Sequence, residues 1–201
     1  LFPTSPSTLD DLLADIERVG EAAGAADAAA DLTKTLRTRR DAVRQRTSAV
    51  ARAGGVPPRV VCLEWLDPLY AAGHWVPEMV TLAGGQDVLA QPGLPSRPVT
   101  WDELVDGRPD LLLLMPCGFS ISRTIEEFAR VQASWPWEQL PAVRAGLVFA
   151  VDAHAYFSRP GPRLFHGLEI LAALCTDPLS RPLPEGAQRL IHHPAESDPD
   201  R

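Results

Sequence analysis

The sequence has little cysteine, no long apolar run and no excess of positive charge, and each shortage excludes a class of protein. Its three cysteines, Cys62, Cys117 and Cys175, are scattered and odd in number, so they form neither a disulfide framework nor a zinc-ligand spacing. No run of about 18 apolar residues occurs, so no segment is predicted to span a membrane. The formal net charge is −7, whereas nucleic-acid binding requires a basic face.

The usual catalytic motifs are missing as well. Residues 118–122 contain only the first half of a Gly-x-Ser-x-Gly nucleophile elbow, and no phosphate-binding Walker pattern occurs. Several residues could in principle meet at one metal ion, but none has the spacing of paired zinc ligands, so separate loop residues are the favoured interpretation. They are Glu64, His74, Cys117, Asp152 and His154. We therefore predict a protein that is not an enzyme and holds no cofactor or metal.

What is present indicates a globular α/β protein. The chain has 201 residues, of which 45% are hydrophobic and 22% charged, enough for a substantial core. From residue 59 onward, predicted strands alternate with predicted helices, as in a Rossmann-like parallel sheet with right-handed crossovers. Strands are predicted at 59–64, 110–115 and 147–151, and helices at 77–83, 101–106, 122–133 and 163–176.

Two further helices are predicted before this region. The first spans 7–19, where Leu9, Leu12, Leu13, Ile16 and Val19 recur at helical spacing. The second is an alanine- and arginine-rich segment from 25 to about 53, which has no proline or internal glycine and would be roughly 40 Å long. Such a helix is longer than a small domain needs, which favours a strut between two lobes. The tail from 177 is expected to be poorly ordered.

Aromatic and polar side chains gather where the predicted strands end. Because the carboxyl ends of parallel strands share one edge of a sheet, the following loops should lie together and form a ligand site. Tryptophan and tyrosine offer large rigid surfaces with one polar edge, which suits a flat, partly apolar ligand. Trp101, Trp135 and Trp137 are not at strand ends and are expected to pack in the core. The residues after the three strands are Trp65, Asp67, Tyr70, His74 and Trp75, then Cys117 and Phe119, then Asp152, His154, Tyr156, Phe157 and Arg159.

Several of these motifs, taken together, resemble a known family. The pattern Glu-Trp-x-Asp-Pro at 64–68 is followed by Gly-x-Trp-x-Pro-Glu-Met-Val-x-Leu-Ala-Gly-Gly at 73–85, and Phe-Ser-Arg-Pro-Gly-Pro-Arg stands at 157–163. Val-Thr-Trp at 99–101 and Arg-Pro-Asp at 108–110 complete the set. It is similar to the cobalamin-binding branch of the iron-siderophore/cobalamin substrate-binding proteins of ABC importers.

The resemblance implies two α/β lobes joined by a rigid helix, with the ligand in the cleft between them. On this basis 1–24 is the end of the amino-terminal lobe, 25–55 the interlobe helix, 56–178 the carboxyl-terminal lobe and 179–201 a tail. We therefore interpret the chain as a fragment. The apolar face of the 7–19 helix would then lack its lobe, and we expect it to be disordered or to bury itself against a second copy.

The resemblance also implies ligand, partners and location. The ligand would be a corrinoid, transported rather than kept as a cofactor, and the partner the permease of an ABC importer in a periplasmic or other extracytoplasmic compartment. Asp102 and Glu103 match the acidic residues that dock on the permease. The ligand-binding residues would be Trp65, Asp67, Tyr70, His74, Trp75, Cys117, Phe119, Tyr156, Phe157 and Arg159. Alternatives are a ferric siderophore or haem in the same fold, a metal-dependent or corrinoid-processing enzyme, or an interaction domain that dimerises through the strut helix.

Overall fold

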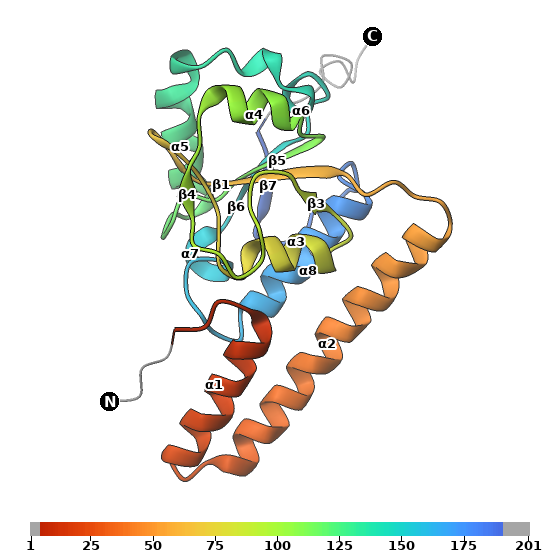
Figure 1. The fold of residues 1–201 in the computed structure, drawn as a ribbon, viewed down its shortest axis with the longest axis vertical. Coiled ribbons are helices and arrows are strands. Elements are labelled where there is room, and N and C mark those ends of the chain that lie inside the picture. The colour runs from red at the N-terminus through yellow and green to blue at the C-terminus, as the bar shows by residue number, and fades with distance from the viewer. Residues whose placement is uncertain (1–4, 191–201) are drawn as a thin grey trace.

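The computed structural model describes residues 5–190 and shows one mixed sheet with helices on both faces (Figure 1). A long helical hairpin projects from one side of this layered body (Figure 1). No helix within 5–190 is both long and apolar enough to cross a membrane. The α/β class predicted for the chain is confirmed.

The centre of the sheet is parallel, as predicted. β1 (Arg59–Leu66), β5 (Leu111–Leu114) and β6 (Val148–Val151) lie side by side in that order, and β3 (Gln86–Asp87) runs parallel to β1. Every residue of β5 and β6 is buried, which is typical of strands covered by helices on both faces. The order places the carboxyl ends of all three main strands at one edge.

The outer strands are antiparallel, which corrects two predictions. Residues 65–75 do not form a single loop, because β1 continues to Leu66 and the chain turns back into β2 (Leu69–Ala71), beside which β4 (Arg97–Pro98) pairs. The described part of the tail is not disordered, since β7 (Ala187–Arg189) pairs with β6. These strands have two or three residues, too few to show an alternating pattern in the sequence. The rest of the tail, with His192 and His193, lies outside the described residues.

Two separate cores lie on the two faces of the sheet. α3 (Val76–Leu82) and α8 (Leu164–Thr176) cover one face, where Cys62 and Cys175 are packed. On the other face Trp101 stacks on Trp135 and meets Trp137 edge-on, confirming that these three pack. The elements of that face are α4 (Trp101–Gly107), α5 (Ile121–Val131), the short turns Gln132–Ser134 and Trp137–Gln139, and α6 (Pro141–Arg144). α7 (Ala153–Tyr156) follows β6 within the predicted loop 152–162.

The expectation of an unburied face on the first helix is wrong. α1 (Leu9–Ala22) packs on the α3–α8 core, and Leu9, Leu12 and Leu13 are all buried there. The backbone N–H of Leu9 donates to a carboxylate oxygen of Glu78 on α3 at 2.8 Å. Only Val19 of the five apolar residues stays substantially exposed. The lobe itself therefore covers most of this face, and the argument for burial against a second copy falls away.

The long helix is present over 27 residues as α2 (Ala26–Arg52). It runs antiparallel to α1 and crosses α8, where the guanidinium of Arg39 donates to both carboxylate oxygens of Glu169 at 2.8 and 2.7 Å. Leu36 and Val43 of its narrow apolar stripe are buried in the same core. Its role as a strut to a second lobe stays a prediction.

Asp87 on β3 should give the folding stability an unusual dependence on pH. Burial raises the pKa of Asp87 to about 6, against the effect of the Leu89 and Ala90 N–H groups that donate to its Oδ1. Between about pH 4 and pH 6 the native state holds a proton that the unfolded chain has lost, so this residue makes stability fall as pH rises. Asp87→Asn should remove this pH dependence, which changes the free energy of unfolding by about 1–3 kcal/mol between pH 4 and pH 6.

The measurement is urea unfolding of wild type and variant at several pH values across that window. Asp106→Asn is the matched control, because Asp106 is exposed. Equal pH slopes for wild type and the Asp87 variant would contradict the prediction.

Candidate functional site

A groove opens where β1 and β5 end, beside the start of α3. Its volume is about 220 Å³, smaller than the sites of most drug-sized ligands. One wall is largely apolar, with Trp75, Val76, Met115 and Phe157 continuous with the core below. The groove is lined by Glu64, Gly73, His74, Trp75, Val76, Ser96, Met115, Cys117, Phe157 and Ser158.

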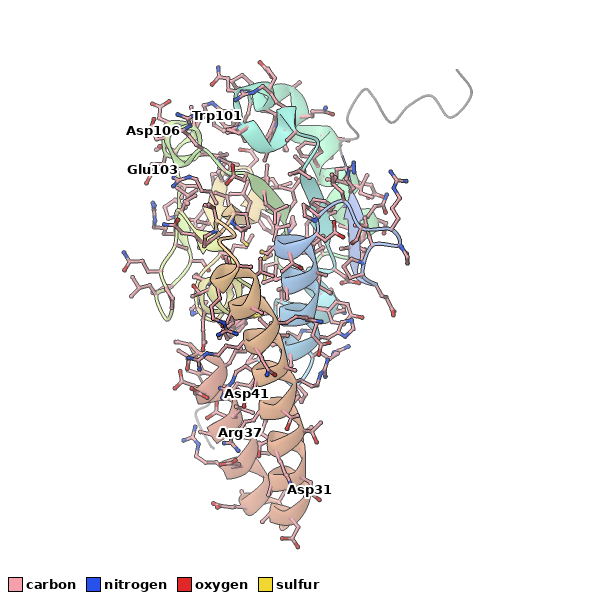
Figure 2. All side chains as sticks on the ribbon, turned by 90° about the vertical axis from the view of Figure 1, so that its right-hand side faces the viewer. Asp31, Arg37, Asp41, Trp101, Glu103 and Asp106 are labelled. Atoms are coloured by element: carbon pink, nitrogen blue, oxygen red, sulfur yellow. The ribbon has the colours of Figure 1, made fainter. Side chains whose placement is uncertain are left out.

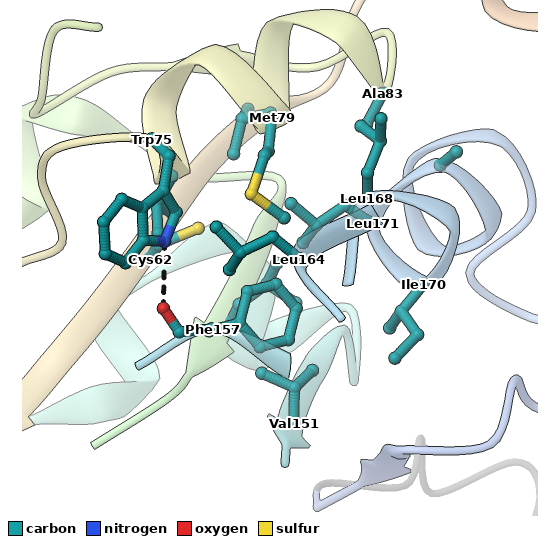
Figure 3. Packing of buried hydrophobic residues seen from close by; sticks show 14 of the residues in the cluster. Cys62, Trp75, Met79, Ala83, Val151, Phe157, Leu164, Leu168, Ile170 and Leu171 are labelled. Atoms are coloured by element: carbon teal, nitrogen blue, oxygen red, sulfur yellow. Dashed lines mark hydrogen bonds between the residues drawn. The ribbon is translucent and has the colours of Figure 1, made fainter. Parts of the chain in front are cut away.

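Hydrogen bonds join the loops that form the groove. The indole Nε1–H of Trp75 donates to the carbonyl of Phe157 at 2.9 Å, as Figure 3 shows. The N–H of Cys117 donates to the carbonyl of Glu64 at 3.0 Å, and the N–H of Gly118 donates to Ser158 Oγ at 2.8 Å. Each bond connects a strand-end loop to another such loop or to β1, so the walls of the groove are held at fixed separations.

The segment that enters α3 is held by a distant loop. His74 has a φ of 55°, which is uncommon for a residue with a side chain. Its N–H donates to the Leu94 carbonyl at 2.6 Å, and its carbonyl accepts from Gly93 at 3.0 Å. A Cβ added to Gly73 would stand 2.2 Å from the backbone nitrogen of Ser96, so only glycine allows this approach.

An aromatic pair stands at the same sheet edge, outside the groove lining. Trp65 is 40% exposed, and its ring lies edge-on to Phe119 with centroids 5.6 Å apart. The guanidinium of Arg123 lies 5.2 Å from the centre of the Phe119 ring. An exposed tryptophan supported in this way offers a flat apolar surface to a ligand.

The structure brings only some of the predicted residues together. His74, Trp75, Cys117 and Phe157 line the groove, and Trp65 with Phe119 stands at the same sheet edge. Tyr156 instead packs its ring on His166, with centroids 4.7 Å apart. The other predicted residues are outside the lining: Asp67, in the turn between β1 and β2; Tyr70, on β2; Asp152, which caps α7; and His154 and Arg159, both exposed.

Six lining residues are not in the predicted ligand set: Glu64, Gly73, Val76, Ser96, Met115 and Ser158. The sequence indicates Glu64 only as a possible metal ligand, although its place at the end of the predicted strand 59–64 is a usable signal for a ligand site. Met115 follows β5 directly and could have been found in the same way. Ser96 comes from a loop with no strand-end position, so no local pattern marks it. Among residues 5–190, no group of three histidine, cysteine or acidic residues could hold a metal ion.

The two predicted docking carboxylates differ in their surroundings. Glu103 belongs to the capping box of α4: its carboxylate accepts from the Thr100 N–H at 2.8 Å and from Arg97 at 2.8 Å. The Thr100 N–H and then Arg97 lower the pKa of Glu103 below its usual value. Asp102 is exposed on the same helix. Figure 2 shows this end of the molecule, labelled at Trp101, Glu103 and Asp106, opposite the hairpin end that carries Asp31.

A sequence profile described as "Periplasmic binding protein" matches residues 1–155. The chain belongs to this family. Its members are solute-binding proteins, which agrees with the prediction that the chain is not an enzyme and carries no resident cofactor. No curated protein sequence matches the chain.

Solved structures share the fold. A periplasmic vitamin B12 binding protein of Vibrio cholerae is 21% identical, with a TM-score of 0.67 over 87% of this chain and 64% of that one. An ABC transporter substrate-binding protein of Listeria monocytogenes is 18% identical, with a TM-score of 0.72 over 85% and 65%. A periplasmic heme-binding protein of Roseiflexus is 24% identical, with a TM-score of 0.69 over 86% and 64%. This chain therefore spans just under two thirds of each of these proteins.

Proposed function

We propose that this chain supplies one wall of a cleft that binds a corrinoid and presents it to the permease of an ABC importer. The observation that carries the proposal is the groove at the carboxyl ends of β1 and β5, with Trp75 in its wall and the exposed Trp65 at the same sheet edge. A groove of about 220 Å³ is too small to enclose a corrinoid. It fits the role of a single wall, with a second lobe closing over the ligand.

The structure of this wall supports the binding of a ligand without catalysis. Its loops are joined by hydrogen bonds from Trp75, Cys117 and Gly118, so little ordering cost remains when a ligand binds. Family membership supports transport as the purpose of that binding, and the similar vitamin B12 binding protein supports the corrinoid. An extracytoplasmic location follows from the same family.

Docking on the permease is assigned to α4. Asp102 is the proposed contact, because the carboxylate of Glu103 already caps the helix and binds Arg97. α4 lies on the face of the sheet away from the hairpin, so a permease could contact it without covering α1 or α2 (Figure 1). An exposed carboxylate of this kind would set register and association rate more than affinity.

Haem is the second candidate. It is favoured by His74, whose imidazole lines the groove, and by the similarity to heme-binding proteins. A tryptophan-fluorescence titration of the full-length gene product with cobalamin and with haem in parallel separates the two. Saturable quenching by cobalamin at micromolar or lower concentration, with haem much weaker, is the expected result. Quenching by haem alone would replace the corrinoid, and no response to either would overturn the proposal.

Trp65→Ala should weaken cobalamin binding about tenfold or more, because a large exposed ring surface is removed from the ligand side. The free energy of unfolding should fall by only about 1 kcal/mol, from the lost edge-on contact with Phe119 and the lost indole hydrogen bond to the Asp67 carbonyl. Absorbance titration gives the affinity without relying on the deleted fluorophore. Leu179→Ala is the control, since Leu179 is also exposed but lies near the far edge of the sheet, before β7. Unchanged affinity in the Trp65 variant would remove this residue from the site.

A further inference from the structure

We infer that Glu64 is a specificity-determining residue of the groove: its carboxylate selects chelates whose periphery carries amides over chelates whose periphery carries carboxylates. The inference rests on the proposed function, since it concerns the ligand of the same site. It names the chemical feature of the ligand that the groove distinguishes.

Glu64 lies near the end of β1, where this strand borders the groove. Cys62, two residues earlier, belongs to the α3–α8 core, and the pairing register of β1 shifts between Leu63 and Trp65, so the strand is irregular where Glu64 reaches the groove. Its backbone carbonyl accepts the N–H of Cys117, which fixes the main chain at this point. The side chain is half-buried and lines the groove beside Trp75 and Ser158.

The carboxylate of Glu64 has no counter-charge. Within residues 5–190 it makes no hydrogen bond or ion pair, and no lysine or arginine lines the groove. Arg123 lies over Phe119, and Arg159 is exposed outside the lining. His74 is the single imidazole of the lining. A carboxyl group with no cationic side chain in the groove lining therefore borders whatever enters.

This charge treats the candidate ligands differently. An ionised carboxylate is only an acceptor, so it pairs with the N–H donors of a primary amide. A ligand carboxylate at the same place would meet a like charge in a partly water-excluded site, which costs affinity. Corrinoids carry neutral amides around the ring, whereas haem carries two propionates and carboxylate siderophores are anionic. The groove thus combines an attractive contact for the first class with a repulsive one for the others.

The test compares cobalamin with its monocarboxylic acids, in which one peripheral amide is hydrolysed to a carboxylate and nothing else differs. Each positional isomer is titrated by absorbance against full-length wild type, Glu64→Gln and Glu64→Asp, near pH 8, where an imidazole is ordinarily neutral. Glu138→Gln is the matched control, because Glu138 is exposed on the opposite face of the sheet and its substitution changes the net charge equally. Thermal unfolding checks that each variant is folded.

We expect wild type to bind at least one isomer about tenfold more weakly than cobalamin. In Glu64→Gln the ratio of the affinity for cobalamin to the affinity for that isomer should fall to about threefold or less. Haem affinity should rise in the same variant. Glu64→Asp, which keeps the charge, and Glu138→Gln should retain most of the wild-type ratio. If wild type binds cobalamin but Glu64→Gln leaves every ratio unchanged, the inference fails and the proposed function stands. If wild type binds no corrinoid, the proposed function fails, and the inference fails with it.

Discussion

Trp75→Ala is expected to lower the free energy of unfolding by about 3–5 kcal/mol, the range for removing a buried large aromatic side chain. Trp75 is only 9% exposed and packs in the α3–α8 core, close to Phe157 and Cys62 in Figure 3. Its indole N–H also holds the carbonyl of Phe157. The substitution therefore leaves both a cavity and an unpaired carbonyl in the groove wall.

Urea unfolding measures the loss of stability, and titration with cobalamin measures the accompanying change in ligand affinity. Trp75→Phe separates the cavity from the lost hydrogen bond, because phenylalanine keeps most of the ring volume but has no N–H to donate. This variant should lose about 1–3 kcal/mol of stability. Trp65→Ala deletes a half-exposed indole at the same sheet edge and should cost only about 1 kcal/mol of stability. A Trp75→Ala protein as stable as the Trp65 variant would show that the ring is not buried as described.

Gly73→Ala should have the second large effect, about 3 kcal/mol of lost stability together with loss of ligand binding. The added Cβ would stand 2.2 Å from the nitrogen of Ser96 and 2.7 Å from the carbonyl oxygen of Leu94. Both are backbone atoms of a loop already held by hydrogen bonds to His74. The loop must move as a whole, which displaces Ser96 from the groove.

Denaturant unfolding measures the stability of Gly73→Ala, and cobalamin titration measures its ligand affinity. Gly161→Ala is the matched control, because a Cβ at Gly161 meets no atom within 4 Å. It should change stability by less than about 0.5 kcal/mol. Wild-type affinity in Gly73→Ala would mean that the loop containing Ser96 adapts and does not shape the ligand site.

Local patterns were sufficient for most of the architecture. The uniformly apolar segments 111–114 and 148–151 are typical of buried strands, and the alanine- and arginine-rich segment before Arg52 is typical of a helix. The strand-end positions of His74, Trp75 and Cys117 also marked the edge at which the groove lies. These features were predictable because periodicity, composition and strand polarity are properties of neighbouring residues.

Other features depend on contacts between distant segments, which no local pattern carries. Ser96 reaches the groove only because Gly73 lets another loop approach, and Tyr156 lies outside the lining because its ring packs on His166. β7 exists because β6 has a free edge to pair with. In the same way α1 is covered because the α3–α8 core has room for Leu9, Leu12 and Leu13. The sequence alone thus indicated the elements and the sheet edge where the groove lies, while packing between distant segments decided which residues line it.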